Sequence, residues 1–338
     1  MTTVPIVAPA DLPELPAGPG TVLTEPLVGI DLRGAVTAVG PVDHDRILVG
    51  IGPVHPGWEP LAADLDLTLV PTAAGPDTVT VENPHATLDI LGRAALDAPR
   101  AATVLASLLR WSGTLAVPAA LDAESFAYST LLGGPEFAAW LDRRGPRPLP
   151  PEVAEPVRVT RDGPVLHLEL NRPERRNAYG RQLRDALVDA LDVALLDPSV
   201  RRVELTGAGP AFCAGGDLDE FGTTPDLATA HLVRTRAGAA RPLHALRERV
   251  AVRLHGACVG AGIELPAFAG HLTAAPDTVI RLPEIAMGLI PGAGGTVSVP
   301  RRIGRHRTLY LALTGHPLDA ATARAWGLVD AVTTDVAR

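Results

Sequence analysis

The chain contains 338 residues, 46% of them apolar, and carries a formal net charge of −8. This composition provides for a large core in one or two domains, and the acidic balance argues against a nucleic-acid-binding surface. No run of 18 uncharged apolar residues occurs and the first residues lack the basic start of a signal peptide, so we expect a cytoplasmic protein without a membrane partner.

Two features of the composition limit the chemistry. All 30 basic residues are arginine, so any phosphate contact must come from arginine or backbone N–H groups, and lysine-based covalent catalysis is excluded. The two cysteines, Cys213 and Cys258, have no CxxC spacing and no nearby cluster of histidines. They therefore predict neither a disulfide framework nor a metal site.

The first part of the chain is predicted to be β-rich and then helical. Residues 1–85 contain short β-like runs separated by Gly and Pro, at Arg46–Ile51, Leu65–Val70 and Thr78–Glu82. Residues 86–150 change to a helical rhythm, at Ala101–Leu109 and at Glu124–Leu141, the latter with Asp122 as its N-cap. The proline-rich stretch Pro146–Pro156 then predicts an extended linker and a domain boundary.

Residues 157–338 alternate strands and helices, which predicts an α/β domain of short strands covered by helices. The predicted strands are Val165–Leu170, Val203–Thr206, Val250–His255 and His271–Ala274. The predicted helices are Tyr179–Leu196, a long Leu227–Glu248, and one that opens near Gly260.

Two glycine-rich loops each follow a predicted strand and precede a predicted helix. They cover Phe212–Leu218 and His255–Glu264. Small residues allow a ligand to approach the backbone closely and leave N–H groups free to donate. Either loop alone is also what an ordinary capped turn looks like. Together, two backbone donors could hold one developing negative oxygen from both sides.

Two glutamates stand in apolar surroundings. Glu264 lies in the run AGIELPAF, and Glu284 follows Leu282-Pro283 at the start of another apolar segment. Glutamate is seldom buried unless it is paired or functional, although a turn or cap role would also fit Glu284. If the two carboxylates face each other, burial and like charge separate their pKa values into an acid and a base.

These segments resemble motifs of the crotonase (enoyl-CoA hydratase/isomerase) family in the order in which that family carries them. Leu170–Ala178 resembles its opening motif, and the two glycine-rich loops resemble its two oxyanion loops. Leu282–Glu284 with Gly288–Thr296, and then Arg301–Asp330, match the stretches that follow. The resemblance implies the spiral α/β fold of short strands and helices shared by this family and ClpP, here preceded by a β-then-α region.

The resemblance also implies specific residues and a reaction. It makes Glu264 and Glu284 the catalytic carboxylates and the N–H groups of Gly216 and Ala261 the oxyanion hole. It places Arg175, Arg176, Ala178, Ala214, Asp217 and Leu218 at the border of the bound CoA. Possession of both carboxylates favours hydration of a 2-enoyl-CoA, with no metal, no cofactor beyond the CoA of the substrate, and assembly as a trimer or hexamer.

Three departures from the family pattern affect this transfer. Pro266 lies two residues after Glu264 inside the expected helix, where it removes a backbone donor. His271 stands where an acidic residue is usual, and we interpret it as a strand residue. The family's terminal helices are expected to be missing after Arg338, and Glu124–Thr130 with the residues that follow resembles them. We therefore hypothesise that residues 99–145 do their lid and oligomer work, as in a circular permutation.

Several alternatives remain open at the level of sequence. Other crotonase chemistry would fit, either double-bond isomerisation or a cofactor-independent acyl-CoA dioxygenation. A non-catalytic acyl-CoA-binding or assembly subunit would also fit, since residues 1–85 match no catalytic motif. A serine peptidase of the related fold lacks support, because no serine lies in a nucleophile elbow.

Overall fold

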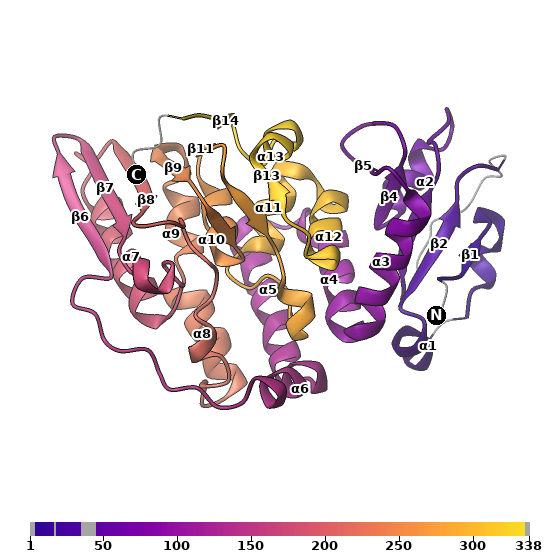
Figure 1. Cartoon of the computed structure of the whole chain (residues 1–338), viewed down its shortest axis with the longest axis horizontal. Coiled ribbons are helices and arrows are strands. Elements are labelled where there is room, and N and C mark those ends of the chain that lie inside the picture. Colours follow the sequence, from indigo (N-terminus) through magenta and orange to yellow (C-terminus); the bar gives the residue numbers. More distant parts are fainter. Residues whose placement is uncertain (1–3, 17, 35–44, 335–338) are drawn as a thin grey trace.

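The computed structural model describes residues 4–16, 18–34 and 45–334. An N-terminal α/β half and a second α/β half lie side by side along the long axis of the molecule, with helices between them (Figure 1). Residues 146–156, the predicted linker, contain neither helix nor strand and run along one edge to the second half (Figure 1). The chain is therefore mixed α/β, as predicted.

In the N-terminal half, the described residues form five parallel strands in sequential order. These are β1 (Ile6–Val7), β2 (Leu27–Asp31), β3 (Ile47–Ile51), β4 (Leu67–Val70) and β5 (Val79–Thr80). Short helices connect them, α1 (Pro19–Thr24), α2 (Glu59–Asp64) and the 3-10 turn Pro9–Glu14. In β3 alternate side chains enter different apolar clusters, Val49 on one face and Leu48 on the other. The sheet is therefore covered on both faces, which explains its continuous apolar runs.

Four helices follow this sheet: α3 (Pro84–Asp97), α4 (Pro99–Ser112), α5 (Val117–Leu132) and α6 (Pro135–Arg144). The single helix predicted over residues 124–141 is wrong, because Gly133-Gly134-Pro135 ends α5 and starts α6. The N-cap prediction for Asp122 is also wrong. Helix α5 begins at Val117 with a proline in its first turn, and Asp122 lies inside it, paired with Arg241.

The second half contains a six-stranded sheet in the order β14-β11-β9-β8-β7-β6 and a three-stranded sheet in the order β10-β12-β13. The strands are β6 (Val157–Asp162), β7 (Val165–Leu170), β8 (Arg202–Gly207), β9 (Val250–Leu254), β10 (Ala257–Val259), β11 (His271–Ala274), β12 (Val279–Arg281), β13 (Leu318–Asp319) and β14 (Ala331–Val332). The helices are α7 (Arg181–Leu196), α8 (Leu227–Ala237), α9 (Ala240–Ala245), α10 (Ala261–Glu264), α11 (Gly295–Ile303), α12 (Arg305–Thr314) and α13 (Ala320–Trp326). Short 3-10 turns cover Pro173–Arg175, Leu218–Glu220, Arg247–Arg249, Pro266–Phe268 and Glu284–Met287.

The strands predicted at Val165–Leu170 and His271–Ala274 have the predicted bounds, and His271 is an exposed strand residue. The long helix predicted over Leu227–Glu248 is wrong, since α8 and α9 are separate. A Cβ at Gly238 would lie 2.4 Å from the carbonyl oxygen of Arg234, so the chain turns closely there. Pro242 has no N–H to donate to the Gly238 carbonyl, which a continuous helix would require.

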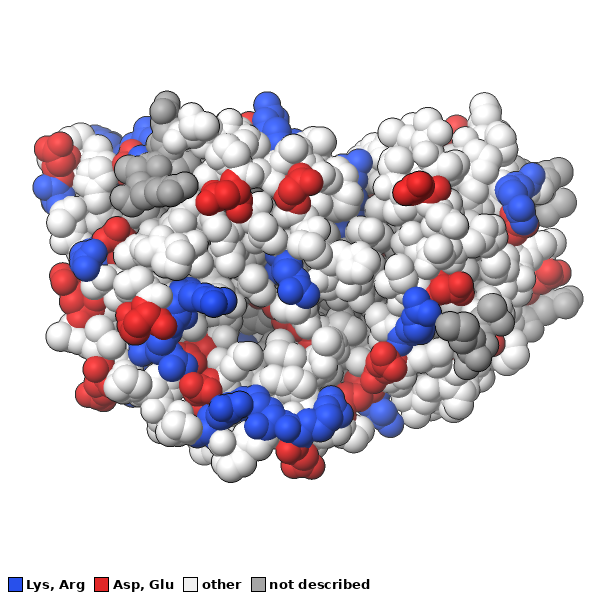
Figure 2. Space-filling view, in the orientation of Figure 1, with Lys and Arg blue, Asp and Glu red and all other residues white. Residues whose placement is uncertain are grey.

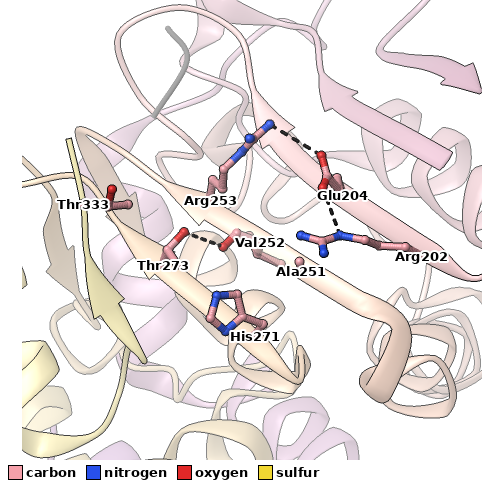
Figure 3. Close-up of a pocket in the computed structure, with 8 residues that line it drawn as sticks. All are labelled: Arg202, Glu204, Ala251, Val252, Arg253, His271, Thr273 and Thr333. Carbon is pink, nitrogen blue, oxygen red and sulfur yellow. Dashed lines mark hydrogen bonds and ion pairs between the residues drawn. The ribbon is translucent and has the colours of Figure 1, made fainter. Parts of the chain in front are cut away.

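One face of the six-stranded sheet is polar. Alternate residues of β7 are buried on the other face, and the polar face carries Arg202, Glu204, Arg253 and His271 around a shallow depression (Figure 3). Glu204 pairs there with Arg202 at 2.9 Å and with Arg253 at 3.8 Å. Glu204, the one carboxylate that lines the depression in the described structure, is already paired, and neither Glu264 nor Glu284 lines it, so the depression is not a candidate active site.

The two halves share one apolar core, and a buried ion pair lies near their contact. Asp66, just before β4, accepts from the Arg110 guanidinium through both oxygens at 2.7 Å and from the backbone N–H of Leu48 at 3.0 Å. Arg305, which opens α12, lies 3.9 Å from the same carboxylate. This carboxylate therefore connects the sheet, α4 and α12.

We expect Asp66→Asn to lower the free energy of unfolding by about 2 kcal/mol, because the amide leaves a donor facing the arginine in a buried place. Urea unfolding followed by circular dichroism measures this as a lower midpoint at an unchanged slope. Asp31→Asn is the matched control, since its partner Arg33 is largely exposed and such pairs contribute little. Equal shifts for the two variants would contradict the expectation.

Candidate active site

The two glycine-rich loops lie against each other. Cys213 and Cys258 form a parallel β-bridge, and the N–H of Val259 donates to the Cys213 carbonyl at 3.0 Å. A Cβ on Gly262 would lie 2.2 Å from that carbonyl oxygen, which is too close for any side chain. The glycine is therefore needed for the close approach of the loops. Burial raises the pKa of the Cys213 thiol to about 12, so the thiol stays protonated.

The two backbone N–H groups predicted to form an oxyanion hole belong to these adjoining loops. Ala261 is the first residue of α10, whose N-terminal amides have no intrahelical acceptor. Gly216 forms a bridge with Tyr179, but the bonds across it use the N–H groups of Tyr179 and Asp217. Within the described residues, neither amide donates to another group of the protein.

Glu264 is buried at the end of α10. Its Oε2 accepts from the N–H groups of Ala293, at 2.7 Å, and Gly295, at 3.0 Å. Pro266 does not kink this helix, because α10 has already ended and Pro266 takes the first position of a 3-10 turn, where no N–H is required. Burial, followed by the negative charges of Glu284 and Glu124, raises the pKa of Glu264 well above its usual value.

Glu284 faces Glu264 across Gly260. A Cβ on Gly260 would lie 2.5 Å from Oε1 of Glu284 and 3.5 Å from Oε1 of Glu264, so both oxygens border the same small space. Gly260 itself has φ 50° and ψ −120°, a conformation that favours glycine. Oε2 of Glu284 is buried and has no hydrogen-bond partner among the described residues. Burial raises the pKa of Glu284 to about 8, with a smaller contribution from the negative charge of Glu124.

A third buried carboxylate, which the sequence did not single out as a site residue, comes from α5 in the first half of the chain. Oε1 of Glu124 accepts from the N–H of Gly294 at 2.7 Å, and Oε2 accepts from the N–H of Thr296 at 2.9 Å and from its hydroxyl at 2.7 Å. Burial raises the pKa of Glu124 to about 7, although these donors and Arg234 oppose the shift. The sequence signal was a glutamate within the apolar stretch of a helix.

The raised carboxyl pKa values make the folded state less stable in alkaline solution. Glu284 has a folded pKa of about 8 against 4.5 for an ordinary glutamate, so the folded protein binds the extra proton and this stability is lost as the pH rises through 8. We expect the unfolding temperature to fall between about pH 5 and pH 8, where the unfolded chain has already released the proton that the folded protein still holds. Differential scanning calorimetry measures it, and Glu284→Gln should flatten the dependence. A wild-type profile as flat as that of the variant would contradict this.

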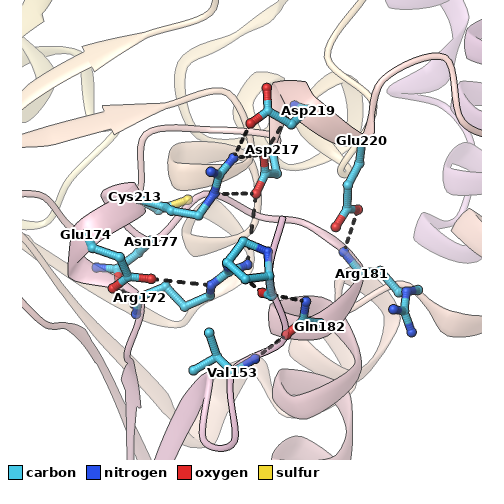
Figure 4. A network of polar contacts seen from close by, with 12 residues as sticks. Val153, Arg172, Glu174, Asn177, Arg181, Gln182, Cys213, Asp217, Asp219 and Glu220 are labelled. Atoms are coloured by element: carbon cyan, nitrogen blue, oxygen red, sulfur yellow. Dashed lines mark hydrogen bonds and ion pairs between the residues drawn. The ribbon is translucent and has the colours of Figure 1, made fainter. Parts of the chain in front are cut away.

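The motif around Leu170–Ala178 forms a polar network beside the first loop (Figure 4). Arg175 donates to both oxygens of Asp217, at 3.0 and 2.6 Å, and to Asp219 at 2.8 Å. Its guanidinium is thus already held by two carboxylates, so its predicted phosphate contact stays a prediction. Buried Asn177 donates to the carbonyls of Ala208, Ala211 and Phe212, which ties the motif to the segment that leads into the first loop.

The other residues predicted to border CoA lie close by. Arg176 is exposed, and its carbonyl accepts from the N–H of Ala214 at 2.9 Å. Ala178 precedes the tyrosine that pairs with the loop, and Leu218 is 44% exposed at the start of a 3-10 turn. The first loop was predicted to lead into a helix that starts after Asp217. This prediction is wrong, because the loop leads into the short 3-10 turn Leu218–Glu220 instead.

Comparison with known proteins identifies the family. Residues 160–337 match the family described as Enoyl-CoA hydratase/isomerase. The chain belongs to this family. It is 36% identical to the 1,2-epoxyphenylacetyl-CoA isomerase of Escherichia coli over 51% of this chain and 67% of that one. It is 37% identical to the 2,3-dehydroadipyl-CoA hydratase of the same organism over 52% of this chain and 68% of that one.

A solved structure gives the same family. The enoyl-CoA hydratase of Thermoplasma volcanium is 34% identical with a TM-score of 0.50, and the match covers 54% of this chain and 73% of that one. The crotonase fold of the second half, predicted from the motifs, is confirmed. In the present chain the family match begins at residue 160, after the linker. Helices α3 to α6 and the N-terminal sheet therefore lie outside the matched segment.

Two further observations concern ligands and membranes. Among the described residues, no group of three or more His, Cys, Asp and Glu side chains is arranged to hold a metal ion. None of the helices in the described ranges has the length and apolar character needed to cross a membrane.

Proposed function

We propose that the protein adds water across the double bond of a 2-enoyl-CoA thioester. The observation that carries this proposal is the pair of buried carboxylates, Glu264 and Glu284, whose oxygens border the same space at Gly260. Addition of water needs one group that takes a proton from water and one that delivers a proton to carbon, and two carboxylates with raised pKa values suit these roles. Family membership and the similar hydratase of Escherichia coli support the reaction class.

In the proposed reaction, one carboxylate takes a proton from water as the water oxygen bonds to the β-carbon of the enoyl group. The electrons of the double bond move toward the thioester carbonyl, and the negative oxygen accepts hydrogen bonds from the N–H groups of Gly216 and Ala261. The other glutamate of the pair, which is protonated, then gives its proton to the α-carbon. Both N–H groups lack an acceptor within the described protein, which supports this role.

We propose that the CoA moiety lies along the motif Arg175–Ala178 and the first loop, where Arg176 is the exposed cation. Arginine side chains also gather where α6 and the start of the linker lie (Figure 2), with Arg143 and Arg144 in the last turn of α6. Arginine suits phosphate recognition because its donors are planar and always charged. We further propose a cytoplasmic location and a trimer or hexamer, as the family resemblance implies; analytical ultracentrifugation tests the latter.

We also propose that α5 and α6 cover the acyl group, in the role of the family's terminal helices. Tyr128 on α5 lies so close to Gly292 that a Cβ there would approach its ring to 2.3 Å. A Cβ on Gly288, just after Glu284, would lie 2.7 Å from the N–H nitrogen of Phe137 on α6. Both helices therefore pack directly on the segment 284–296, which carries Glu284 and the backbone amides that bind Glu264.

The test is to mix the full-length protein with crotonyl-CoA and with longer and aromatic enoyl-CoA thioesters. Hydration removes the absorbance of the conjugated enoyl thioester and yields a product heavier by one water in mass spectrometry. A product of unchanged mass with a moved double bond would instead indicate isomerisation. Binding by calorimetry without turnover of any thioester would indicate an acyl-CoA-binding subunit.

A further inference from the structure

We propose that Glu124, contributed by α5 from outside the family-matched segment, is a positioning residue that fixes the start of α11 and through it the carboxylate of Glu264. The inference rests on the proposed function of Glu264. It assigns a role in the active site to the N-terminal half of the chain. It also specifies which side chain performs that role.

The geometry that carries the proposal is an alternation along four successive backbone amides. The N–H groups of Ala293 and Gly295 donate to Glu264, at 2.7 and 3.0 Å. Those of Gly294 and Thr296 donate to Glu124, at 2.7 and 2.9 Å. The segment therefore lies between two carboxylates and cannot shift toward one without losing bonds to the other.

A helix start offers N–H groups with no intrahelical acceptor, and a carboxylate there is favoured by the helix dipole. Gly294 adopts φ 102° and ψ 6° as the N-cap and has no side chain that could cap the helix. Glu124, which lies 170 positions earlier in the chain than Gly294, supplies the capping carboxylate instead. Its carboxylate accepts from three donors, one at Oε1 and two at Oε2.

The charged and titratable groups that face Glu124 come from four elements. Arg234 on α8 is its attractive partner at longer range, and Glu264 and Glu284 are like charges from α10 and the 3-10 turn at Glu284–Met287. Tyr128, one turn along α5, lies under the Arg234 guanidinium at 4.7 Å from the ring centroid. Removing the negative charge of Glu124 therefore stabilises the ionised forms of Glu264 and Glu284.

The experiment compares Glu124→Gln with the matched control Asp122→Asn, which removes an acid from the same helix and an ion pair with Arg241. Glutamine places its NH2 group against one of the donors and loses that bond. We expect kcat on crotonyl-CoA to fall by about tenfold to a hundredfold with little change in KM, because the carboxylate of Glu264 is misplaced. We also expect the pH profile of kcat to move to lower pH, whereas Asp122→Asn changes neither.

A second variant keeps the charge. Thr296→Val removes only the hydroxyl donor to Glu124 in a fully buried place, and we expect about a threefold lower kcat without the shift in the pH profile caused by loss of charge. In addition, carbon-13 NMR of carboxyl-labelled glutamate follows the titration of Glu264 and Glu284 without turnover. Glu124→Gln should move at least one of these titrations to lower pH.

The outcomes separate the two proposals. No turnover by the wild-type protein overturns the proposed function, while the NMR titrations still test whether Glu124 acts on the pair. Turnover by the wild type with an unchanged kcat and pH profile in Glu124→Gln overturns the positioning role. If Glu124→Gln does not fold, Thr296→Val with a wild-type kcat overturns it.

Discussion

Replacing Glu284 by glutamine is expected to reduce kcat on an enoyl-CoA substrate by about a thousandfold, because proton transfer by a positioned carboxyl group contributes on the order of 10²–10⁴ to rate. Glutamine keeps the size of the side chain but can neither take nor give the proton. The buried Oε2 of Glu284 has no partner among the described residues, so the substitution disturbs few bonds within the protein. Binding of the thioester is expected to change little.

Initial rates with crotonyl-CoA and calorimetric titration with a saturated acyl-CoA measure the two expectations separately. Glu248→Gln is the control, since Glu248 is largely exposed and, among the described residues, pairs only with its neighbour Arg247. A Glu284→Gln enzyme that keeps more than a tenth of the wild-type kcat would remove Glu284 from the acid/base pair. Loss of binding together with kcat would instead indicate a role in holding the substrate.

Gly262→Ala is expected to have the second large effect, on stability and turnover together. The added methyl group would lie 2.2 Å from the Cys213 carbonyl oxygen, so the two loops must move apart. Forcing an extra methyl into a packed place typically costs about 1–3 kcal/mol. Because those loops carry the N–H groups of Gly216 and Ala261, we also expect turnover to be lost.

Urea unfolding and initial rates measure these effects, with Gly20→Ala in α1 as the control. No atom lies within 4 Å of a Cβ built on Gly20, so this change is expected to be neutral or to stabilise by about 0.5 kcal/mol. If Gly262→Ala unfolds like the wild type and retains turnover, the loops are not held together by this contact. An equal loss in both variants would point to a general effect of added methyl groups.

The sequence predicted those parts of the fold in which periodicity and local chemistry agree. In β7 the apolar residues alternate, and its bounds were predicted as observed. The strand β2 was missed because it follows a proline-rich stretch, and its pairing with β1 and β3 depends on residues distant in sequence. The break between α8 and α9 was missed because Gly238 and Pro242 act through geometry rather than through the apolar pattern.

For the site, the motifs predicted the carboxylates and the loops but not how they meet. Gly260 sets the space between Glu264 and Glu284, and this follows from a close contact that spacing does not reveal. Glu124 was noted only as part of a helix resembling the family's terminal helices. Its partners are donors 170 and 172 residues away, so no local pattern could have assigned them.

The long separation between Glu124 and the start of α11 has a consequence for synthesis on the ribosome. Helix α5 leaves the exit tunnel well before Gly294 and Thr296 are translated, so during that interval its buried carboxylate has no amide partners. Contacts of such sequence separation form late and slowly. Until then the face of α5 that carries Glu124 is exposed to water together with the apolar residues around it, which predicts a need for chaperone protection until the last third of the chain emerges.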